Sequence, residues 1–578
     1  MIKNESANRK TQVNTDGTFI MRKCYMPAFH EVLKKHAVYL LTALLCLSFA
    51  PSHAGEDGRC FLRDGDRWLI LGDSITNNGT YVRMVRRMLN HFHPGADIEI
   101  NGTGIDGITS DHAFSKENQN SSVVSIMLGI NDAIHSGYDK VDREKVLGAY
   151  RQSMLKIVKL HQANGSIVLL LSSPLVDENF GRGWWELRNS NELLREFPQI
   201  LQEIAKETGA YYIPVQEEME AYRIRLQKTF GIVRPLYPDG VHPNGWAQYQ
   251  IAKTLWEHLN VSGQVSQKGE ERRLAPAFKP VPVEVSLCKK FSERGEPVKL
   301  RLKSSEPVNF SLGWSYGNLR GRTTLPLTPE GTEWIVPLKG EDLDVKPGQN
   351  RTLVFDLVSG TDRSIHILDI TGTRVWHLNQ EKAVGGDIPL EGTPKHGTWK
   401  ISKYEGGLLL SGTVIDKDIR GDAELFTSRD GVHIFLDLRQ RPRFAELAFD
   451  EDVHFFCLTI QEKPCFGVGI SPSWGRGLSF AGYGGARKTA DGYDWHFYIS
   501  HGFKDRDKSF DVEKRDFIGF NIDIVDGGVG SDGKKSFEWV KFAKTDYDIQ
   551  NFPSFLQILD MKNELKGDEV LVLNLWGP

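Results

Sequence analysis

Between about residues 67 and 259, nearly continuous apolar stretches alternate with stretches whose apolar residues recur every three or four positions. Continuous apolar stretches predict strands that are buried on both faces, and the three- or four-residue spacing predicts amphipathic helices. The predicted strands span residues 67–73, 97–102, 122–132, 166–174 and 210–216, and the predicted helices span 81–92, 143–162, 191–209 and 245–259. This alternation indicates a parallel sheet with helices on both faces, and therefore one α/β domain over residues 60–262.

The helical spacing largely disappears after that domain. Residues 263–278 are polar and predict a linker. Residues 279–385 alternate polar and apolar positions and are interrupted by Gly and Pro, which predicts a β-sandwich domain of unknown role. Residues 390–578 predict a second β-sandwich. A chain of 578 residues exceeds what one compact core usually holds, which agrees with a multidomain organisation.

The N-terminus has a pattern of its own. Lys34 and Lys35 precede an apolar stretch at 37–50, and small residues up to Ala54 follow it. This order is typical of a secretory signal peptide, so residues 1–54 are predicted to be an N-terminal extension and signal peptide that is cleaved near Ala54. The mature chain would then be secreted or periplasmic, without an integral membrane span. An uncleaved N-terminal anchor is the alternative, although the apolar stretch is short for a bilayer.

Composition narrows the classes of partner and cofactor. The formal net charge is −4 and there is no long basic run, which argues against a nucleic-acid partner. The cysteines outside the N-terminal segment are Cys60, Cys288, Cys457 and Cys465, and they permit a disulfide without defining its pairing. No cluster of Cys and His residues predicts a metal site.

Four short motifs stand where predicted strands end or a predicted helix begins. "GDSIT" brings Ser74 after the first strand, "NGTGIDG" brings Gly104 after the second, and "GIND" brings Asn131 after the third. "YPDGVHPNG" brings Asp239 and His242 just before the last helix. Because ligands of parallel α/β sheets bind beyond the carboxyl ends of the strands, we expect these residues to surround one pocket.

These residue types suit acyl transfer. A serine nucleophile needs a general base, for which His242 is the candidate, and Asp239 is placed to orient the imidazole. The backbone N–H groups of Ser74 and Gly104 and the side-chain amide of Asn131 are candidate donors to an oxyanion. Taken singly, the motifs have plainer interpretations as a helix N-cap and as turns. Their occurrence together, in order and at strand ends, favours a catalytic site.

The four blocks resemble those of the SGNH (GDSL-type) hydrolase family. The resemblance implies a flavodoxin-like α/β/α fold and a Ser-His-Asp esterase that needs neither a metal nor another cofactor. One departure is that Asn101 lies three residues before Gly104 rather than two, which leaves Gly102 as an alternative donor. Asp73 and Asp132 belong to the blocks and are interpreted as residues that shape the loops rather than perform chemistry.

Specificity is expected to come from variable loops. "VDENFGRGWWELRNSNELL" places Trp184 and Trp185 after the fourth predicted strand, where exposed aromatic rings would stack on sugars. These two residues are therefore candidate substrate-binding residues. The alternative is that both rings pack the loop onto the domain.

The last predicted domain resembles the family 9 carbohydrate-binding modules and their relatives. The resemblance lies in "LLLSGTVIDKD", "SRDGVHIFLDLRQ", "DGYDWHFYIS" and "SFEWVKF", and it implies a β-sandwich that holds a glycan. The available aromatic rings are Trp474, Tyr483, Trp495 and Trp539, with burial in the core as the alternative for most of them. Asp416, Asp418 and Asp526 are candidates for a structural Ca²⁺ site, with solvated turn acids as the commoner explanation.

The functional hypothesis is a secreted serine esterase that removes O-acyl groups, acetyl above all, from a polysaccharide or oligosaccharide. The C-terminal module would hold the enzyme near the glycan. The alternatives are a lipid esterase, an aryl esterase or a thioesterase of the same fold, and a glycan-binding protein whose hydrolase domain is idle. No long apolar lid segment supports a lipase, and no paired carboxylates at strand ends support a glycoside hydrolase.

Overall fold

The computed structural model divides into two units, Met1–Gly58 and Arg59–Pro578, and every described helix and strand lies in the second. The described residues are 58–576 without 112–119, 139–141, 179–186, 188, 231–235, 238–239, 268, 277, 282, 290, 379–382, 390–395, 405–406, 417–430, 438–452, 460–467, 471–481, 500–502, 506–507, 511–513, 530–534 and 542–556. The predicted signal peptide lies outside them. Within the described part of the chain, no helix is long and apolar enough to cross a membrane.

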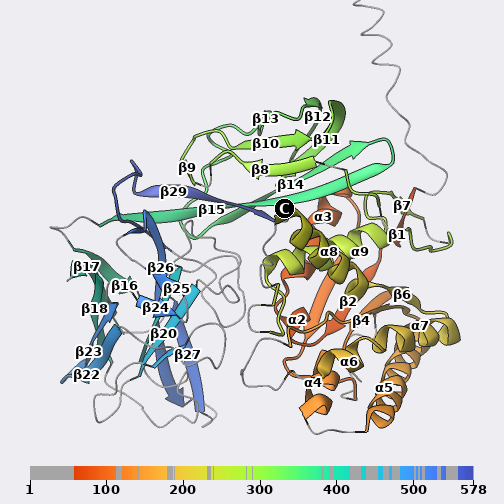
Figure 1. Ribbon diagram of the computed structural model, residues 1–578, viewed down its shortest axis with the longest axis horizontal. Coiled ribbons are helices and arrows are strands. Elements are labelled where there is room, and N and C mark those ends of the chain that lie inside the picture. Colours follow the sequence, from red (N-terminus) through yellow and green to blue (C-terminus); the bar gives the residue numbers. More distant parts are fainter. Residues whose placement is uncertain are drawn as a thin grey trace, which may run out of the picture. The chain divides into compact units, whose positions relative to one another are not determined.

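A five-stranded parallel sheet forms the centre of the N-terminal region (Figure 1). Its strands, in spatial order, are β3 (Glu99–Gly104), β2 (Arg67–Gly72), β4 (Val123–Met127), β5 (Ile167–Leu171) and β6 (Tyr211–Ile213). These are the strands that the continuous apolar stretches predict. The order is that of flavodoxin-like sheets.

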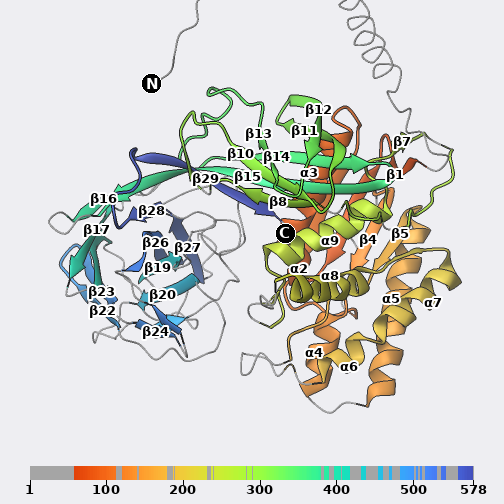
Figure 2. The same ribbon diagram turned by 45° about the horizontal axis from the view of Figure 1, so that its top comes forward.

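Helices cover both faces of this sheet, as the alternating pattern predicts (Figures 1 and 2). One group packs together on one face, namely α3 (Thr80–Phe92), α8 (Val215–Phe230) and α9 (Gly245–His258). The other group comprises α4 (Ile130–Tyr138), α5 (Arg143–Ala163), α6 (Ser190–Leu194) and α7 (Phe197–Thr208). The single helix predicted at 191–209 is thus two helices, because Pro198 occupies the first turn of α7 and starts a new helix there.

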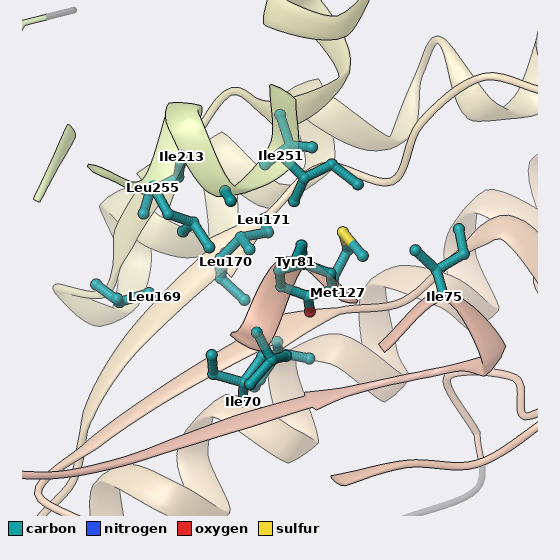
Figure 3. Close-up of a cluster of buried hydrophobic side chains, with 14 of the residues drawn as sticks. Ile70, Ile75, Tyr81, Met127, Leu169, Leu170, Leu171, Ile213, Ile251 and Leu255 are labelled. Carbon is teal, nitrogen blue, oxygen red and sulfur yellow. The ribbon is translucent and has the colours of Figure 1, made fainter. Parts of the chain in front are cut away.

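The core of this region lies between the sheet and its helices. Figure 3 shows buried side chains of this core, among them Ile70, Met127 and Leu171 of the strands and Ile251 and Leu255 of α9. All five side chains are at most 1% exposed. Burying side chains of this size contributes about 1.5–3 kcal/mol each, so this layer is what holds the strand ends in place.

The polar segment after α9 packs against the α/β region through two contacts. Strand β7 (Gln264–Ser266) pairs in parallel with β1 (Arg59–Arg63). Farther on, Arg272 is buried and its Nη1 lies 2.7 Å from Oδ2 of Asp66. The interpretation of residues 263–278 as a linker between domains stays a prediction, although Arg272 finds its partner far away in sequence.

The remainder of the chain is built of strands. Their bounds are β8 (Val283–Leu287), β9 (Phe291–Glu293), β10 (Lys299–Ser304), β11 (Val308–Tyr316), β12 (Leu319–Leu327), β13 (Thr332–Ile335), β14 (Asn350–Ser359), β15 (Asp362–His377), β16 (Val384–Pro389), β17 (His396–Tyr404), β18 (Gly407–Ile415), β19 (Gly431–Asp437), β20 (Val453–Thr459), β21 (Val468–Ile470), β22 (Gly482–Lys488), β23 (Gly492–Ile499), β24 (Phe503–Asp505), β25 (Lys508–Phe510), β26 (Phe517–Val529), β27 (Lys535–Lys541), β28 (Gln557–Asp560) and β29 (Glu569–Trp576). Their sheets are consistent with β-sandwiches.

The last strand returns to the middle of the chain. Strand β29 pairs antiparallel with β15 and with β9, and Figures 1 and 2 both show it beside β15. The sequence pattern placed this strand in the C-terminal domain, whereas its hydrogen bonds belong to a sheet of the middle region. The predicted domain boundaries stay predictions.

The middle sheet shares its core with the α/β region. Val354, Ile365, Ile367 and Trp576 belong to the same buried cluster as the parallel strands. Polar contacts cross the same boundary, because Tyr249 Oη donates to the carbonyl oxygen of Ile365. The middle region is thus packed on the α/β region within one unit.

Candidate active site

The ends of three neighbouring strands lie level with one another. Gly72 at the end of β2 is in register with Gly104 of β3 on one side and Met127 of β4 on the other. From β2 the chain proceeds toward β3, and from β4 it proceeds toward β5, so the winding reverses between β2 and β4. Ligands of such sheets bind in the crevice at this reversal. Ser74 and Asn131 follow the two strands that border it.

Ser74 is the first residue of the short helix α2 (Ser74–Asn77) and is partly exposed. The preceding residue, Asp73, caps this helix, because its Oδ1 accepts from Ile75 N at 3.0 Å. Before it, a Cβ on Gly72 would lie 2.0 Å from Thr76 Oγ1, so the strand can turn this tightly into the helix only with glycine. The tight turn puts the serine hydroxyl at the carboxyl edge of the sheet.

His242 reaches that hydroxyl from the other end of the domain. Its Nε2 lies 2.8 Å from Ser74 Oγ, although the two residues are 168 positions apart. The segment that carries the histidine is held on both sides: Gly240 O accepts from Asp177 N at 2.8 Å, and Asn244 Oδ1 accepts from Ala247 N at 3.0 Å as the N-cap of α9. The structure thus brings together the predicted nucleophile and general base.

The third residue of the predicted triad, Asp239, lies outside the described residues, as do Trp184 and Trp185. The orienting role of Asp239 and the substrate-binding role of the two tryptophans therefore stay predictions.

Gly104 stands where the end of β3 meets α2. A Cβ at this position would lie 2.2 Å from Asn77 N and 2.4 Å from Asp73 O. Both of these are backbone atoms, so no side-chain movement would relieve the overlap. The position accepts only glycine, and the close approach keeps the backbone of Gly104 next to the turn that carries Ser74.

Asn131 is buried in the first turn of α4. Its Nδ2 donates to the carbonyl oxygen of Ile108 at 3.0 Å, which orients the side chain. The amide nitrogen carries two hydrogens, and among the described residues only the carbonyl oxygen of Ile108 is bonded to it, so a second hydrogen is left for a ligand. This arrangement suits the predicted oxyanion donor, and the donor role itself stays a prediction.

The alternative donor, Gly102, has a different environment. It lies inside β3 opposite Ile70, and a Cβ on it would contact Val82 of α3 at 3.2 Å. The exposed Asn101 donates to Glu99 Oε1 at 2.7 Å. Neither residue is directed to the turn at Ser74, because both are part of the strand rather than its end.

Two carboxyl groups, that of the buried Asp73 and that of the half-buried Asp132, support the loops around the site. Asp132 accepts from Ser110, whose Oγ lies 2.6 Å from Oδ1 and whose N lies 3.1 Å from both carboxylate oxygens. Burial raises the pKa of Asp132. Burial likewise raises the pKa of Asp73 to about 7, although the Ile75 N–H bond and the charge of His242 oppose the rise. These contacts are those of residues that shape loops.

We expect Asp73→Asn to change the pH dependence of stability. In the unfolded chain Asp73 releases its proton near pH 4, whereas the folded chain holds it up to about pH 7. Between these values a rise in pH therefore favours unfolding, by up to about 4 kcal/mol from this group, and the loss is complete above pH 7. The variant lacks this loss, so its stability relative to the wild type should rise steadily from about pH 4 to about pH 7.

Urea unfolding of both proteins across this pH range measures the difference. In the variant an amide nitrogen takes the place of Oδ2, an atom that has no hydrogen-bond partner among the described residues. Burying this amide costs about 1–3 kcal/mol at every pH. The cost shifts the whole curve of unfolding free energy against pH without changing its slope. Parallel curves for wild type and variant would contradict the prediction.

Sequence analysis missed two residues at the rim of the site. Ile105, directly after Gly104, is 44% exposed. Asp106 accepts from Asn77 Nδ2 at 2.9 Å and so connects this rim to α2. The available signal was their position beside a motif glycine at a strand end.

The remaining predicted features concern metals, cysteines and aromatic rings. Among the described residues, no group of three or more His, Cys, Asp or Glu is arranged to hold a metal ion. Cys60 and Cys288 are free thiols, and burial raises the pKa of Cys60 to about 12.

Trp495 is a buried core residue, 2% exposed. Trp474, Asp418 and Cys465 lie outside the described residues, as do the side chains of Tyr483, Trp539, Asp526 and Cys457. The Ca²⁺ site stays a prediction.

Part of the chain is similar to known proteins. Residues 70–249 match the GDSL-like lipase/acylhydrolase family. The acetylxylan esterase Axe2 from Geobacillus stearothermophilus is 22% identical over 36% of this chain and 99% of that chain, with a TM-score of 0.29. The α/β hydrolase LAE5 from the metagenome of Lake Arreo, Spain, is 16% identical over 36% of this chain and 100% of that chain, also with a TM-score of 0.29. No curated protein matches the chain closely enough to count as a relative. Residues 70–249 are thus similar to the GDSL-like lipase/acylhydrolase family over the part of the chain that carries Ser74 and His242.

Proposed function

We propose that this domain is a serine esterase that removes short O-acyl groups, acetyl above all, from a polysaccharide outside the cytoplasm. One observation carries the proposal: Ser74 Oγ and His242 Nε2 lie 2.8 Å apart at the carboxyl edge of the sheet. A serine hydroxyl becomes a useful nucleophile only when such a base is in hydrogen-bond contact with it.

In the proposed mechanism His242 Nε2 takes the proton of Ser74 Oγ as that oxygen attacks the carbonyl carbon of the ester. The tetrahedral intermediate collapses to an acyl-serine, and His242 returns the proton to the departing sugar oxygen. Water then attacks the acyl-serine with the same base, which releases the carboxylic acid and restores Ser74. Asp239 would hold the other ring nitrogen of His242 and stabilise the imidazolium.

The negative charge that develops on the acyl oxygen needs fixed donors. Our candidates are the backbone N–H groups of Ser74 and Gly104 and the free amide hydrogen of Asn131. Donors that are already oriented stabilise the transition state more than water does, because they need no reorganisation during the reaction. Ile105, which is exposed next to Gly104, is our candidate for contact with a small apolar acyl group.

The polysaccharide part of the proposal rests on the sequence: the C-terminal stretch that resembles a carbohydrate-binding module, and Trp184 with Trp185 in the segment that follows β5 in sequence. Export rests on the N-terminal segment that is typical of a signal peptide. A lipid or aryl esterase or a thioesterase would use the same nucleophile and base, so the substrate must be tested directly.

Acetate release from a panel of acetylated polysaccharides, compared with hydrolysis of a long-chain 4-nitrophenyl ester, tests the substrate. We expect release from at least one acetylated polymer and little turnover of the long-chain ester. The opposite preference would favour a lipid or aryl esterase. A serine-directed phosphonate that leaves Ser74 unlabelled would instead favour a glycan-binding protein with an idle hydrolase domain.

A further inference from the structure

Residues 105–110 follow β3 as an irregular stretch of chain, which we call the connecting segment. Its first residue is still bonded to the sheet, because Ile105 N donates to the carbonyl oxygen of Gly72 at 3.1 Å. Next to it, Asp106 accepts from Asn77 Nδ2 of α2 at 2.9 Å. The start of the connecting segment is therefore held by β2 and by the helix that begins with the proposed nucleophile.

The end of the connecting segment is held by two side chains from the first turn of α4. Asn131 Nδ2 donates to the carbonyl oxygen of Ile108 at 3.0 Å. Asp132 accepts from Ser110 with both carboxylate oxygens: Oδ1 lies 2.6 Å from the hydroxyl oxygen, and both oxygens lie 3.1 Å from the backbone nitrogen. Because Ser110 is only 2% exposed, water does not replace these bonds if the carboxylate is removed.

The first turn of α4 is a firm support for this contact. Tyr150 Oη of α5 donates to the carbonyl oxygen of Leu128, just before the helix, at 2.9 Å. A Cβ on Gly129 would lie 2.9 Å from a ring carbon of Phe197 of α7, so both helices close over the turn between β4 and α4. The connecting segment is more open to solvent, since Ile105 is 44% exposed. It therefore takes its position from α4 rather than the reverse.

The connecting segment meets all three elements that carry the candidate oxyanion donors. Ser74 N is at the start of α2, Gly104 N is at the end of β3, and the amide of Asn131 is on α4. The carbonyl oxygen of Ile108 takes one hydrogen of the Asn131 amide and so sets the direction of the other. The bonds to Ser110 lie only two residues farther along the chain, so they hold this carbonyl in place.

We propose that Asp132 is a positioning residue, which holds the connecting segment so that the side-chain amide of Asn131 is oriented to donate to the oxyanion. The inference rests on the proposed function, because the oxyanion forms only when Ser74 attacks an ester. In this role Asp132 acts through Asn131 and not on the substrate. Its effect on the reaction is large because a donor stabilises the transition state only when it is already aimed at the developing charge.

A second role of the same carboxylate has to be separated from this one. Asp132 lies in the first turn of α4, where a negative charge stabilises the helix. That role needs the charge, whereas the proposed role needs an acceptor oxygen. Asp132→Asn separates the two, because Oδ1 alone accepts from both the nitrogen and the hydroxyl of Ser110 and an amide oxygen can replace it.

Steady-state hydrolysis of 4-nitrophenyl acetate by the full chain tests the proposal. We expect Asp132→Ala to lower kcat and kcat/KM equally, by about tenfold to a hundredfold, because the interaction that it weakens is made only in the transition state. Asp132→Asn should stay within about threefold of the wild type. The double variant Asn131→Ala with Asp132→Ala should be no slower than Asn131→Ala alone, because no amide is left to position.

Two further variants complete the comparison. Ser110→Ala removes only the hydroxyl group and leaves the carboxylate in place, so it should lower kcat by about threefold to tenfold, and it tests the same contact if Asp132→Ala fails to fold. The control is Asp142→Ala, which removes the N-cap of α5, where Asp142 accepts from Glu144 N at 3.0 Å. It should lower the melting temperature and leave kcat unchanged.

Losses that multiply in the double variant would overturn the proposal, because Asp132 would then act independently of Asn131. Asp132→Asn as slow as Asp132→Ala would overturn it too, by assigning the effect to the charge at the helix. So would wild-type kcat in both Asp132→Ala and Ser110→Ala. In these cases the wild type is still an esterase and the proposed function stands. A wild type that hydrolyses no ester would refute the proposed function, and this inference with it.

Discussion

Ser74→Ala is expected to lower kcat for ester hydrolysis by about four orders of magnitude or more. The methyl group cannot form the acyl-enzyme, and His242 Nε2 loses the hydroxyl that lies 2.8 Å away. Stability should change by less than about 0.5 kcal/mol, because Ser74 is partly exposed and alanine suits the first turn of α2. Steady-state hydrolysis of 4-nitrophenyl acetate measures the first effect, and thermal unfolding measures the second.

The matched control is Ser286→Ala, a half-buried serine of β8, which should leave kcat unchanged. Asn131→Ala provides a graded comparison. It removes one donor and leaves the nucleophile, so it should cost only about 10²–10³ in kcat. Wild-type turnover by Ser74→Ala would refute the assignment of the nucleophile. An Asn131→Ala loss as large as that of Ser74→Ala would mean that the side chain does more than donate one hydrogen bond.

The parallel sheet was predictable because strands that are buried on both faces consist almost entirely of apolar residues. Helix α8 escaped prediction although it carries the right spacing: Val215, Met219, Tyr222 and Leu226 are all buried, between charged residues that dominate the segment. The motifs predicted that Ser74 and His242 act together as nucleophile and base, but the local sequence could not predict that their side chains are in contact. It depends on the order β3-β2-β4 and on the cap of α9, and neither is local in sequence.

Features that depend on distant partners could not be predicted. Arg272 looks like part of a solvated linker until Asp66 is found 2.7 Å from it, 206 positions earlier. Strand β29 has the same alternating pattern as its neighbours in sequence, and nothing in that pattern says that it pairs with β15. Long-range pairing of this kind is selected by packing, and the local periodicity of the sequence carries no information about it.

Asp369→Ala is expected to lower the free energy of unfolding by about 3–5 kcal/mol. Asp369 lies on β15, is 1% exposed, and accepts from three donors that come from different parts of the chain. They are Arg87 Nη1 of α3 at 2.9 Å, Thr352 Oγ1 of β14 at 2.7 Å and Trp576 Nε1 of β29 at 2.7 Å. Alanine would remove the acceptor for all three, including the buried indole N–H.

The exposed pair of Arg294 with Asp344 provides the control, since the side chain of each residue is 46% exposed. Asp344→Ala should cost less than about 1 kcal/mol, because solvent screens an exposed ion pair and replaces its hydrogen bonds. Asp369→Asn, which keeps one acceptor oxygen and loses the charge, should lie between the two alanine variants. Urea unfolding of the full chain measures all three. If Asp369→Ala were no more costly than Asp344→Ala, the middle sheet would not be anchored to the acylhydrolase domain through this carboxylate, and the shared hydrophobic cluster around Trp576 alone would account for their packing.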